Sequence, residues 1–90
     1  MNEIVLHKKA EKQLGKVPTY IRIKFQIWVT DVEENGIEST RTVPGYHDEP
    51  LKGKRKGQRS VRLSKAYRAI YVEQRDAIII EVIEVNKHDY

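Results

Sequence analysis

The sequence predicts an α+β domain, in which one short strand and two helices precede three strands. Five apolar residues recur at helical spacing and form one face of a helix: Ile21, Phe25, Trp28, Val29 and Val32. The last third of the chain holds three β-like segments, at 59–63, 67–73 and 77–85. An antiparallel sheet of these strands, with both helices packed on one face, would bury the two apolar surfaces in one core.

The elements follow in order along the chain. Asn2–His7 alternates loosely and indicates a first strand, and Lys8–Leu14 is rich in helix formers. Gly15 is a typical helix terminator, and Pro18 suits the first turn of the second helix. Asn35-Gly36 closes that helix. The last β-like segment starts apolar on both faces, which favours a central position in the sheet.

Between Gly36 and Gln58 the periodicity fails, and prolines and glycines indicate a long connection. Connections of more than about 12–15 residues without structure are uncommon in compact domains and are often functional. This one holds His47, Asp48 and Glu49, followed by a run of basic residues. We therefore expect functional side chains in this connection.

Size and composition narrow the possible classes of protein. Ninety residues predict one small domain, 1–90, with a single core. Cysteine is absent, which excludes disulfides, thiolate chemistry and cysteine-ligated zinc. No apolar run approaches the roughly 20 residues of a membrane span, and the first residues do not read as a signal peptide. We therefore expect a cytoplasmic protein that makes no contact with membranes.

The charge of the chain is concentrated in one segment. Eight of the seventeen Lys and Arg residues lie within residues 52–68, here called the basic cluster, and no acidic residue interrupts them. The remainder carries nine basic and thirteen acidic residues, so the net charge of +4 comes from this cluster. So local a positive field favours a polyanion, and nucleic acid is the first candidate.

Three groups of residues could support RNA cleavage by attack of a 2′-hydroxyl on the adjacent phosphate. The reaction needs a base, an acid for the leaving oxygen and a cation for the phosphate, and neither metal nor cofactor. Residues of these chemical types occur in three places: Glu49 with its neighbours His47 and Asp48, the pair Arg62 and Arg68, and the tail 88–90. Each residue also has a non-catalytic interpretation. The Glu could form a surface ion pair, the terminal His could simply be solvated, and each Arg could cover a face of the sheet. The sequence contains no HxH or HExxH motif, so the spacing of its histidines does not predict a metal site.

At this point the chain resembles a known family. The segments Leu51–Gly53, Arg59–Leu63 and Tyr67–Tyr71 are similar to the second half of RelE/ParE superfamily toxins, which belong to bacterial type II toxin–antitoxin modules. The predicted order β-α-α-β-β-β also matches the RelE-like fold. The resemblance therefore covers nearly the whole chain, although the helical half matches in pattern alone.

Two branches of that superfamily are most similar. Glu49-Pro50-Leu51-Lys52 and the closing His88-Asp89-Tyr90 resemble YoeB-type mRNA interferases. That resemblance implies Glu49 as base, Arg68 at the phosphate and His88 as acid. It also implies a role for Tyr90, although the inserted Asp89 departs from the His-Tyr ending of that branch. The run 51–57 and the ending also resemble HigB-type toxins, which brings Asp89, Lys54 and His47 into consideration.

The resemblance implies a ribosome-dependent endoribonuclease that cleaves mRNA without a cofactor. Its RNA-binding surface would be formed by Lys52, Lys54, Arg55, Lys56, Arg59 and Arg62. Its partners would be the ribosome with its RNA, mRNA and a cognate antitoxin. The antitoxin could bind to the exposed parts of the stripe Tyr20/Ile23/Ile27. The alternatives are a ParE-type toxin that inhibits DNA gyrase and a non-enzymatic RNA-binding module.

Overall fold

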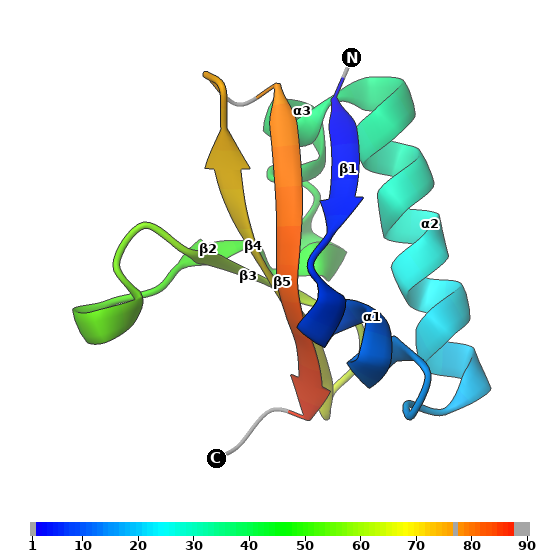
Figure 1. Ribbon diagram of the computed structural model, residues 1–90. Coiled ribbons are helices and arrows are strands. Elements are labelled where there is room, and N and C mark those ends of the chain that lie inside the picture. The colour runs from blue at the N-terminus through cyan, green and yellow to red at the C-terminus, as the bar shows by residue number, and fades with distance from the viewer. Residues whose placement is uncertain (1, 77, 88–90) are drawn as a thin grey trace.

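The computed structural model describes residues 2–76 and 78–87 of the chain, and Figure 1 shows its architecture. The elements are β1 (Glu3–Leu6), α1 (Lys8–Leu14), α2 (Thr19–Asn35), α3 (Ile37–Thr40), η1 (Pro44–Tyr46), β2 (Glu49–Pro50), η2 (Gly53–Arg55), β3 (Arg59–Arg62), β4 (Tyr67–Gln74) and β5 (Ile79–Lys87). The segments η1 and η2 are single 3₁₀ turns. The predicted α+β class is confirmed, and α1 has the bounds that its composition indicated.

The strands form one five-stranded sheet in the order β1-β5-β4-β3-β2 (Figure 1). Strands β2 to β5 pair antiparallel, as predicted. Strand β1 instead pairs parallel with β5, where Glu3 faces Ile79 and Leu6 faces Val82. No hairpin joins these two strands, so their connection does not impose an antiparallel orientation. Strand β5 therefore lies between β1 and β4, in the central position expected from its apolar start.

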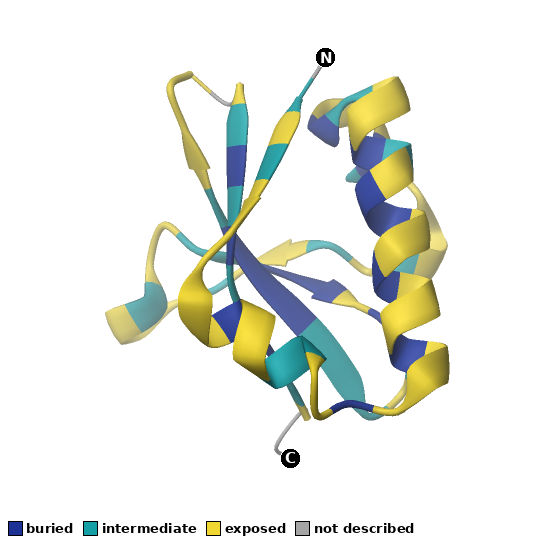
Figure 2. Cartoon of the chain, turned by 45° about the vertical axis from the view of Figure 1, so that its right-hand side comes forward, coloured by how far each residue is buried: buried dark blue, intermediate teal, exposed yellow. Residues whose placement is uncertain are grey.

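The core lies between the sheet and α2. The five α2 residues predicted to face it are all buried, and Trp28 has no exposed surface. The Trp28 ring packs on the Tyr71 ring of β4 with centroids 5.5 Å apart, and Phe25 lies 5.9 Å from Trp28. Figure 2 shows the buried side of α2 turned toward the sheet and its other side exposed. Tyr20 lies on that outer side and is 54% exposed.

Helix α1 lies beside the part of β5 that β1 does not reach. It contributes Ala10, fully buried, to the same core. The Gln13 Oε1 atom accepts a hydrogen bond from the Val85 N–H at 2.7 Å, beyond the last β1–β5 pair. This contact satisfies a donor that an uncovered sheet edge would expose. None of the helices in the described part of the chain is both long and apolar enough to cross a membrane.

Two expectations need correction. The connection 36–58 is not structureless, because α3, η1, β2 and η2 all fall within it. These elements are too short to produce a periodic sequence signal. The last strand begins at Ile79, so Ile78 is not part of it as predicted, and Ala77, where the prediction began the strand, lies outside the described residues. Arg75 and Asp76 have φ values of 51° and 56°, and the resulting turn extends to Ile78, which is 57% exposed.

Candidate active site

Polar side chains from β2, β3 and β4 share the face of the sheet that α2 does not cover. Val61 and Ala69 are paired and lie in the core. Because strand side chains alternate between faces, the neighbouring pair Arg62 and Arg68 lies on the other side. Glu49 pairs with Ser60, two residues from Arg62, and is therefore on the same face as the two arginines.

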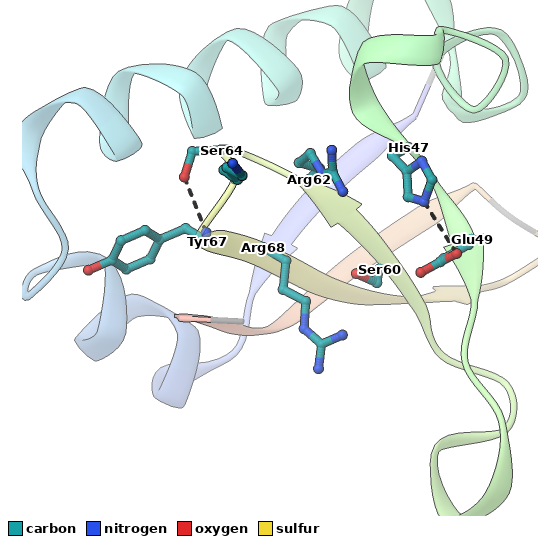
Figure 3. A pocket seen from close by; sticks show the side chains of 8 residues that line it. His47, Glu49, Ser60, Arg62, Ser64, Tyr67 and Arg68 are labelled. Atoms are coloured by element: carbon teal, nitrogen blue, oxygen red, sulfur yellow. Dashed lines mark hydrogen bonds and ion pairs between the residues drawn. The ribbon is translucent and has the colours of Figure 1, made fainter. Parts of the chain in front are cut away.

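These residues line a pocket of about 230 Å³ (Figure 3). Its walls come from the segment before β2, from β3, from the turn after it and from the start of β4: His47, Glu49, Ser60, Arg62, Ser64, Lys65, Tyr67 and Arg68. The Ser64 hydroxyl oxygen accepts hydrogen bonds from the Ala66 and Tyr67 N–H groups at 3.2 Å, which fixes the turn. The structure thus brings three predicted site residues, Glu49, Arg62 and Arg68, into one pocket.

The side chains of the pocket could bind an anion. Arg62 and Arg68 face each other directly across two strands, an arrangement of like charges that destabilises a sheet unless an anion lies between them. The Arg68 Nε atom is buried, and no described group accepts a hydrogen bond from it. A phosphate would satisfy this donor and both charges, because guanidinium groups bind phosphate through paired N–H groups.

An imidazole and a carboxylate meet at the rim of the pocket. The His47 Nε2 and Glu49 Oε2 atoms are 3.6 Å apart, and both side chains are more than half exposed. His47 has a φ of 45°, in the left-handed region that non-glycine residues seldom adopt. Figure 3 shows the His47 ring next to the Glu49 carboxylate, with Ser60 beside Glu49. This pair could exchange protons with a substrate held by the arginines.

The residues on either side of His47 hold this rim to the body of the protein. The Tyr46 hydroxyl donates a hydrogen bond to Asp31 of α2 at 2.9 Å. Burial, together with this bond and the charge of Asp31, raises the pKa of Tyr46 to about 12. On the other side, the Asp48 side chain is 1% exposed and is bound to β3 and β4. Sequence reasoning named Asp48 only as a neighbour of Glu49 and missed this anchor.

The basic cluster divides into residues that bind other protein groups and residues that face solvent. Arg55 donates to Glu84 of β5 at 2.6 Å, and Arg59 donates to Asp48 at 2.7 Å. Lys52, Lys54 and Lys56 are exposed. Of the six residues predicted to bind RNA, two therefore have their guanidinium groups engaged by carboxylates, three are exposed lysines, and Arg62 lies in the pocket.

Glu84 is a buried carboxylate on the same side of the sheet as the pocket, since its neighbour Asn86 pairs with Arg68. Burial opposes its ionisation, but the hydrogen bond and charge of Arg55, with Lys9 and Asn86, outweigh burial and lower the pKa of Glu84. Lys9 lies 3.7 Å from it, and the Asn86 amide donates to it at 2.7 Å. The negative charge of Glu84 is thus balanced by Arg55 and Lys9, so Glu84 does not compete with an anion for Arg62 and Arg68.

His88, Asp89 and Tyr90 lie outside the described residues, so their predicted roles stay predictions. The described chain ends at Lys87, which pairs with Tyr67 in the wall of the pocket, and His88 follows it in the sequence. Among residues 2–76 and 78–87, no three His, Asp or Glu side chains gather as a metal site requires.

Comparisons with known proteins agree with the fold described above. No protein-family model and no curated protein matches the sequence. Solved structures do match: YafQ from Escherichia coli strain BL21(DE3) has a TM-score of 0.78 at 16% identity, covering 98% of this chain and 94% of that one. A YoeB/ParE toxin from Agrobacterium tumefaciens has a TM-score of 0.75 at 18% identity, with 97% and 99% coverage.

A third match is the toxin–antitoxin complex RelBE2 from Mycobacterium tuberculosis, with a TM-score of 0.63, 17% identity and 97% and 98% coverage. The chain has the RelE/ParE toxin fold. The similarity spans whole chains on both sides, so the predicted resemblance is confirmed in its architecture. In this chain the RelE/ParE fold places its pocket on the side of the sheet that α2 leaves open.

Proposed function

We propose that the chain is the toxin of a type II toxin–antitoxin module and that it cleaves mRNA on the ribosome, in the cytoplasm. The observation that carries the proposal is the pocket itself. It places a carboxylate, Glu49, across from two arginines, Arg62 and Arg68, of which one has a buried donor free for an anion. The fold, shared with structures described as toxins, supports the same assignment.

The proposed reaction is transfer of a phosphodiester to its own 2′-oxygen. Glu49 takes the proton of the 2′-hydroxyl, the 2′-oxygen forms a bond to phosphorus, and the bond from phosphorus to the 5′-oxygen breaks. His88, assigned from the family resemblance, donates a proton to the leaving 5′-oxygen, and Arg62 and Arg68 stabilise the negative charge of the transition state. The products are a 2′,3′-cyclic phosphate and a 5′-hydroxyl. No metal or cofactor takes part.

The HigB-like reading gives a different assignment to the same pocket. His47 is 3.6 Å from Glu49 and could act in place of His88, with Lys54 and Asp89 also taking part. Comparison of His47→Gln with His88→Gln separates the two readings. A loss of cleavage confined to the second variant supports the YoeB-like assignment, and a loss confined to the first supports the HigB-like one.

The exposed lysines of the basic cluster supply the proposed RNA surface. Lys52, Lys54 and Lys56 face solvent beside the pocket strands and require no rearrangement to contact phosphates. Arg55 and Arg59 would first have to leave Glu84 and Asp48. Each phosphate contact adds about −0.7 to the slope of log affinity against log salt for single strands. Replacing all three lysines by glutamine should therefore reduce that slope by about 2.

Translation-dependent cleavage of a reporter mRNA tests the proposal. We expect Glu49→Gln and Arg68→Lys to lower the cleavage rate by about 100-fold or more, the range of general acid–base and electrostatic contributions. Glu33→Gln is the matched control, because Glu33 is an exposed acid on the outer side of α2. Wild-type rates in both pocket variants would refute the assignment.

Two other assays distinguish the alternatives. Inhibition of gyrase supercoiling by the wild-type protein, with intact mRNA, would identify a ParE-type activity. Salt-sensitive binding to RNA without cleavage on translating ribosomes would identify a binding module.

A cognate antitoxin is the proposed protein partner, as in the RelBE2 complex. Tyr20, Ile23 and Ile27 on the outer side of α2 are all 54–56% exposed. A shallow apolar groove at Ile23 and Ile27 adjoins a second groove, which also contains Ile27 and reaches Arg62 and Lys65 of the active-site pocket. An amphipathic segment with acidic residues would fill both grooves and neutralise the pocket.

Co-expression with the product of the neighbouring reading frame tests this seat. We expect rescue of growth by that product, and loss of rescue when Ile23 and Ile27 are both replaced by lysine. A double replacement at Glu11 and Lys12, which are exposed on α1, is the control. Undiminished rescue of the Ile23/Ile27 variant, at equal toxicity, would place the antitoxin elsewhere.

A further inference from the structure

Asp48 is a buried carboxylate immediately before the proposed base. Its Oδ1 atom accepts a hydrogen bond from the Arg59 Nε at 2.7 Å, and its Oδ2 atom accepts one from the Tyr71 hydroxyl at 2.5 Å. The Arg41 Nε lies 3.9 Å from Oδ1. Arg41 in turn pairs with Glu73 of β4. The carboxylate is thus enclosed by two cations and a phenol, which compensate its removal from water.

Apart from Asp48, the segment that carries Glu49 is held by the short β2–β3 pairing and by the Leu51 N–H, which donates to the Gln58 carbonyl oxygen at 2.9 Å. Strand β2 is two residues long, and its second residue, Pro50, has no N–H to donate to the sheet. Both neighbours of His47 point inward, Tyr46 to α2 and Asp48 to β3 and β4, whereas His47 and Glu49 line the pocket. Asp48 also binds Arg59, the residue that pairs with Pro50, so its side chain fastens β2 to β3 directly.

We propose that Asp48 is a positioning residue that holds the Glu49 carboxylate at the scissile phosphate. The inference rests on the proposed cleavage reaction and assigns to Asp48 no contact with RNA. Its side chain has almost no exposed surface and lies on the core side of the rim. It acts through the backbone of one peptide unit, which fixes where the Glu49 side chain begins.

The anchor requires an ionised carboxylate and not merely a polar group of that shape. Arg59 and Tyr71 both donate hydrogen bonds to it, so its two oxygens must both accept. An ionised aspartate is an acceptor only, whereas an asparagine would present an NH₂ group to one of the two donors. Asp48→Asn should therefore release one side of the anchor while changing the side-chain volume very little.

Steady-state cleavage by three variants tests this role, at a temperature where each is shown by circular dichroism to be folded. Asp48→Asn is expected to lower kcat by about 10- to 100-fold, the cost of a displacement near 1 Å at a reacting group, and to change KM for ribosome-bound mRNA less than about 3-fold. Glu73→Gln is the matched control, since it breaks the Arg41–Glu73 ion pair of the same network and leaves the Arg59 and Tyr71 hydrogen bonds to Asp48 in place. It should leave kcat unchanged.

The double variant Asp48→Asn/Glu49→Gln provides the decisive comparison. If Asp48 acts through Glu49, kcat of the double variant equals that of Glu49→Gln alone, because a base that is absent cannot be misplaced. Additive losses would overturn the inference, as would equal losses of kcat in Asp48→Asn and Glu73→Gln. Glu49→Gln at wild-type rate would instead refute the proposed reaction.

A measurement without RNA keeps the inference testable should the protein prove not to be a nuclease. Backbone ¹⁵N relaxation dispersion reports microsecond-to-millisecond motion of the His47 and Glu49 amides. We expect exchange broadening of both amides in Asp48→Asn and none in Glu73→Gln or the wild type. Unchanged dynamics in Asp48→Asn would show that the rim is held without Asp48.

Discussion

Replacing Tyr71 by phenylalanine should destabilise the protein well beyond the effect expected for the loss of one oxygen atom. Tyr71 is fully buried, with its ring against Trp28 and its hydroxyl donating to Asp48 at 2.5 Å. Burial, followed by the hydrogen bond and charge of Asp48, raises the pKa of Tyr71, so the phenol stays protonated and donates. The variant keeps the ring and removes the hydroxyl, which donates to Asp48 and accepts a longer hydrogen bond from Arg41 at 3.4 Å.

The magnitude follows from what the donor leaves behind. Packing is almost unchanged, because phenylalanine fills the same space, so no cavity penalty of the large-to-small kind arises. The Asp48 Oδ2 atom loses the Tyr71 hydroxyl as its donor, and because the side chain is only 1% exposed, water does not replace that donor. A hydrogen bond to a charged group contributes about 1.5–3 kcal/mol to the free energy of unfolding. For a domain of this size, 2 kcal/mol corresponds to a fall in Tm of roughly 8–16 °C.

Thermal and urea unfolding, each followed by circular dichroism, measure this effect. Tyr20→Phe is the control, since the Tyr20 ring is 54% exposed on the outer side of α2 and its replacement should shift Tm by less than about 2 °C. An equally small shift in Tyr71→Phe would refute the reasoning, because it would mean that the Asp48 carboxylate does not depend on this donor. The same result would weaken the anchor on which Glu49 positioning rests.

Three further predictions concern stability. The pKa of Glu84 is lowered in the folded protein, so the stability that its ionisation provides is present above its unfolded pKa and is lost as pH falls through its folded pKa. Glu84→Gln should therefore make Tm depend less on pH on the acid side, in thermal unfolding measured across a pH series. Tyr46 has a raised pKa, so its contribution is present below about pH 10 and is lost as pH rises through about 12, which absorbance at 295 nm during alkaline titration should show. Gly57 has a φ of 94° and open space around it, so Gly57→Ala should cost about 1–2 kcal/mol in urea unfolding, whereas Gly45→Ala, with equal space and no positive φ, should cost less.

Local signals in the sequence predicted the elements that such signals can determine. The helix Lys8–Leu14 has the predicted bounds because Gly15 ends it and the residues before it favour a helix. The apolar face of α2 was predicted because its spacing repeats over three turns, and its last residue, Asn35, precedes a glycine with a φ of 87°. Both predictions depend only on residues within one helix or directly after it.

Features that depend on distant residues were not predictable in this way. The parallel pairing of β1 with β5 joins residues about 76 positions apart, and no local pattern specifies it. Strand β2 is too short to alternate, so Glu49 could be named as a candidate from its residue type and from the resemblance, but not placed beside Ser60. The burial of Asp48 depends on Arg59 and Tyr71, which come to it only when the sheet forms.

The basic cluster shows how the fold assigns different tasks to residues that look equivalent in the sequence. Arg59 and Arg62 are three positions apart on one strand, so alternation sends one to the buried Asp48 and the other to the pocket. The pairing of Arg62 with Arg68 then concentrates two charges where the proposed phosphate would lie. While Arg59 is paired with Asp48 it does not bind RNA, but the pair fixes the loop that presents Glu49 to that phosphate. The local excess of positive charge thus supports both substrate binding and the rigidity of the rim, and the two effects are separable because they lie on opposite faces of β3.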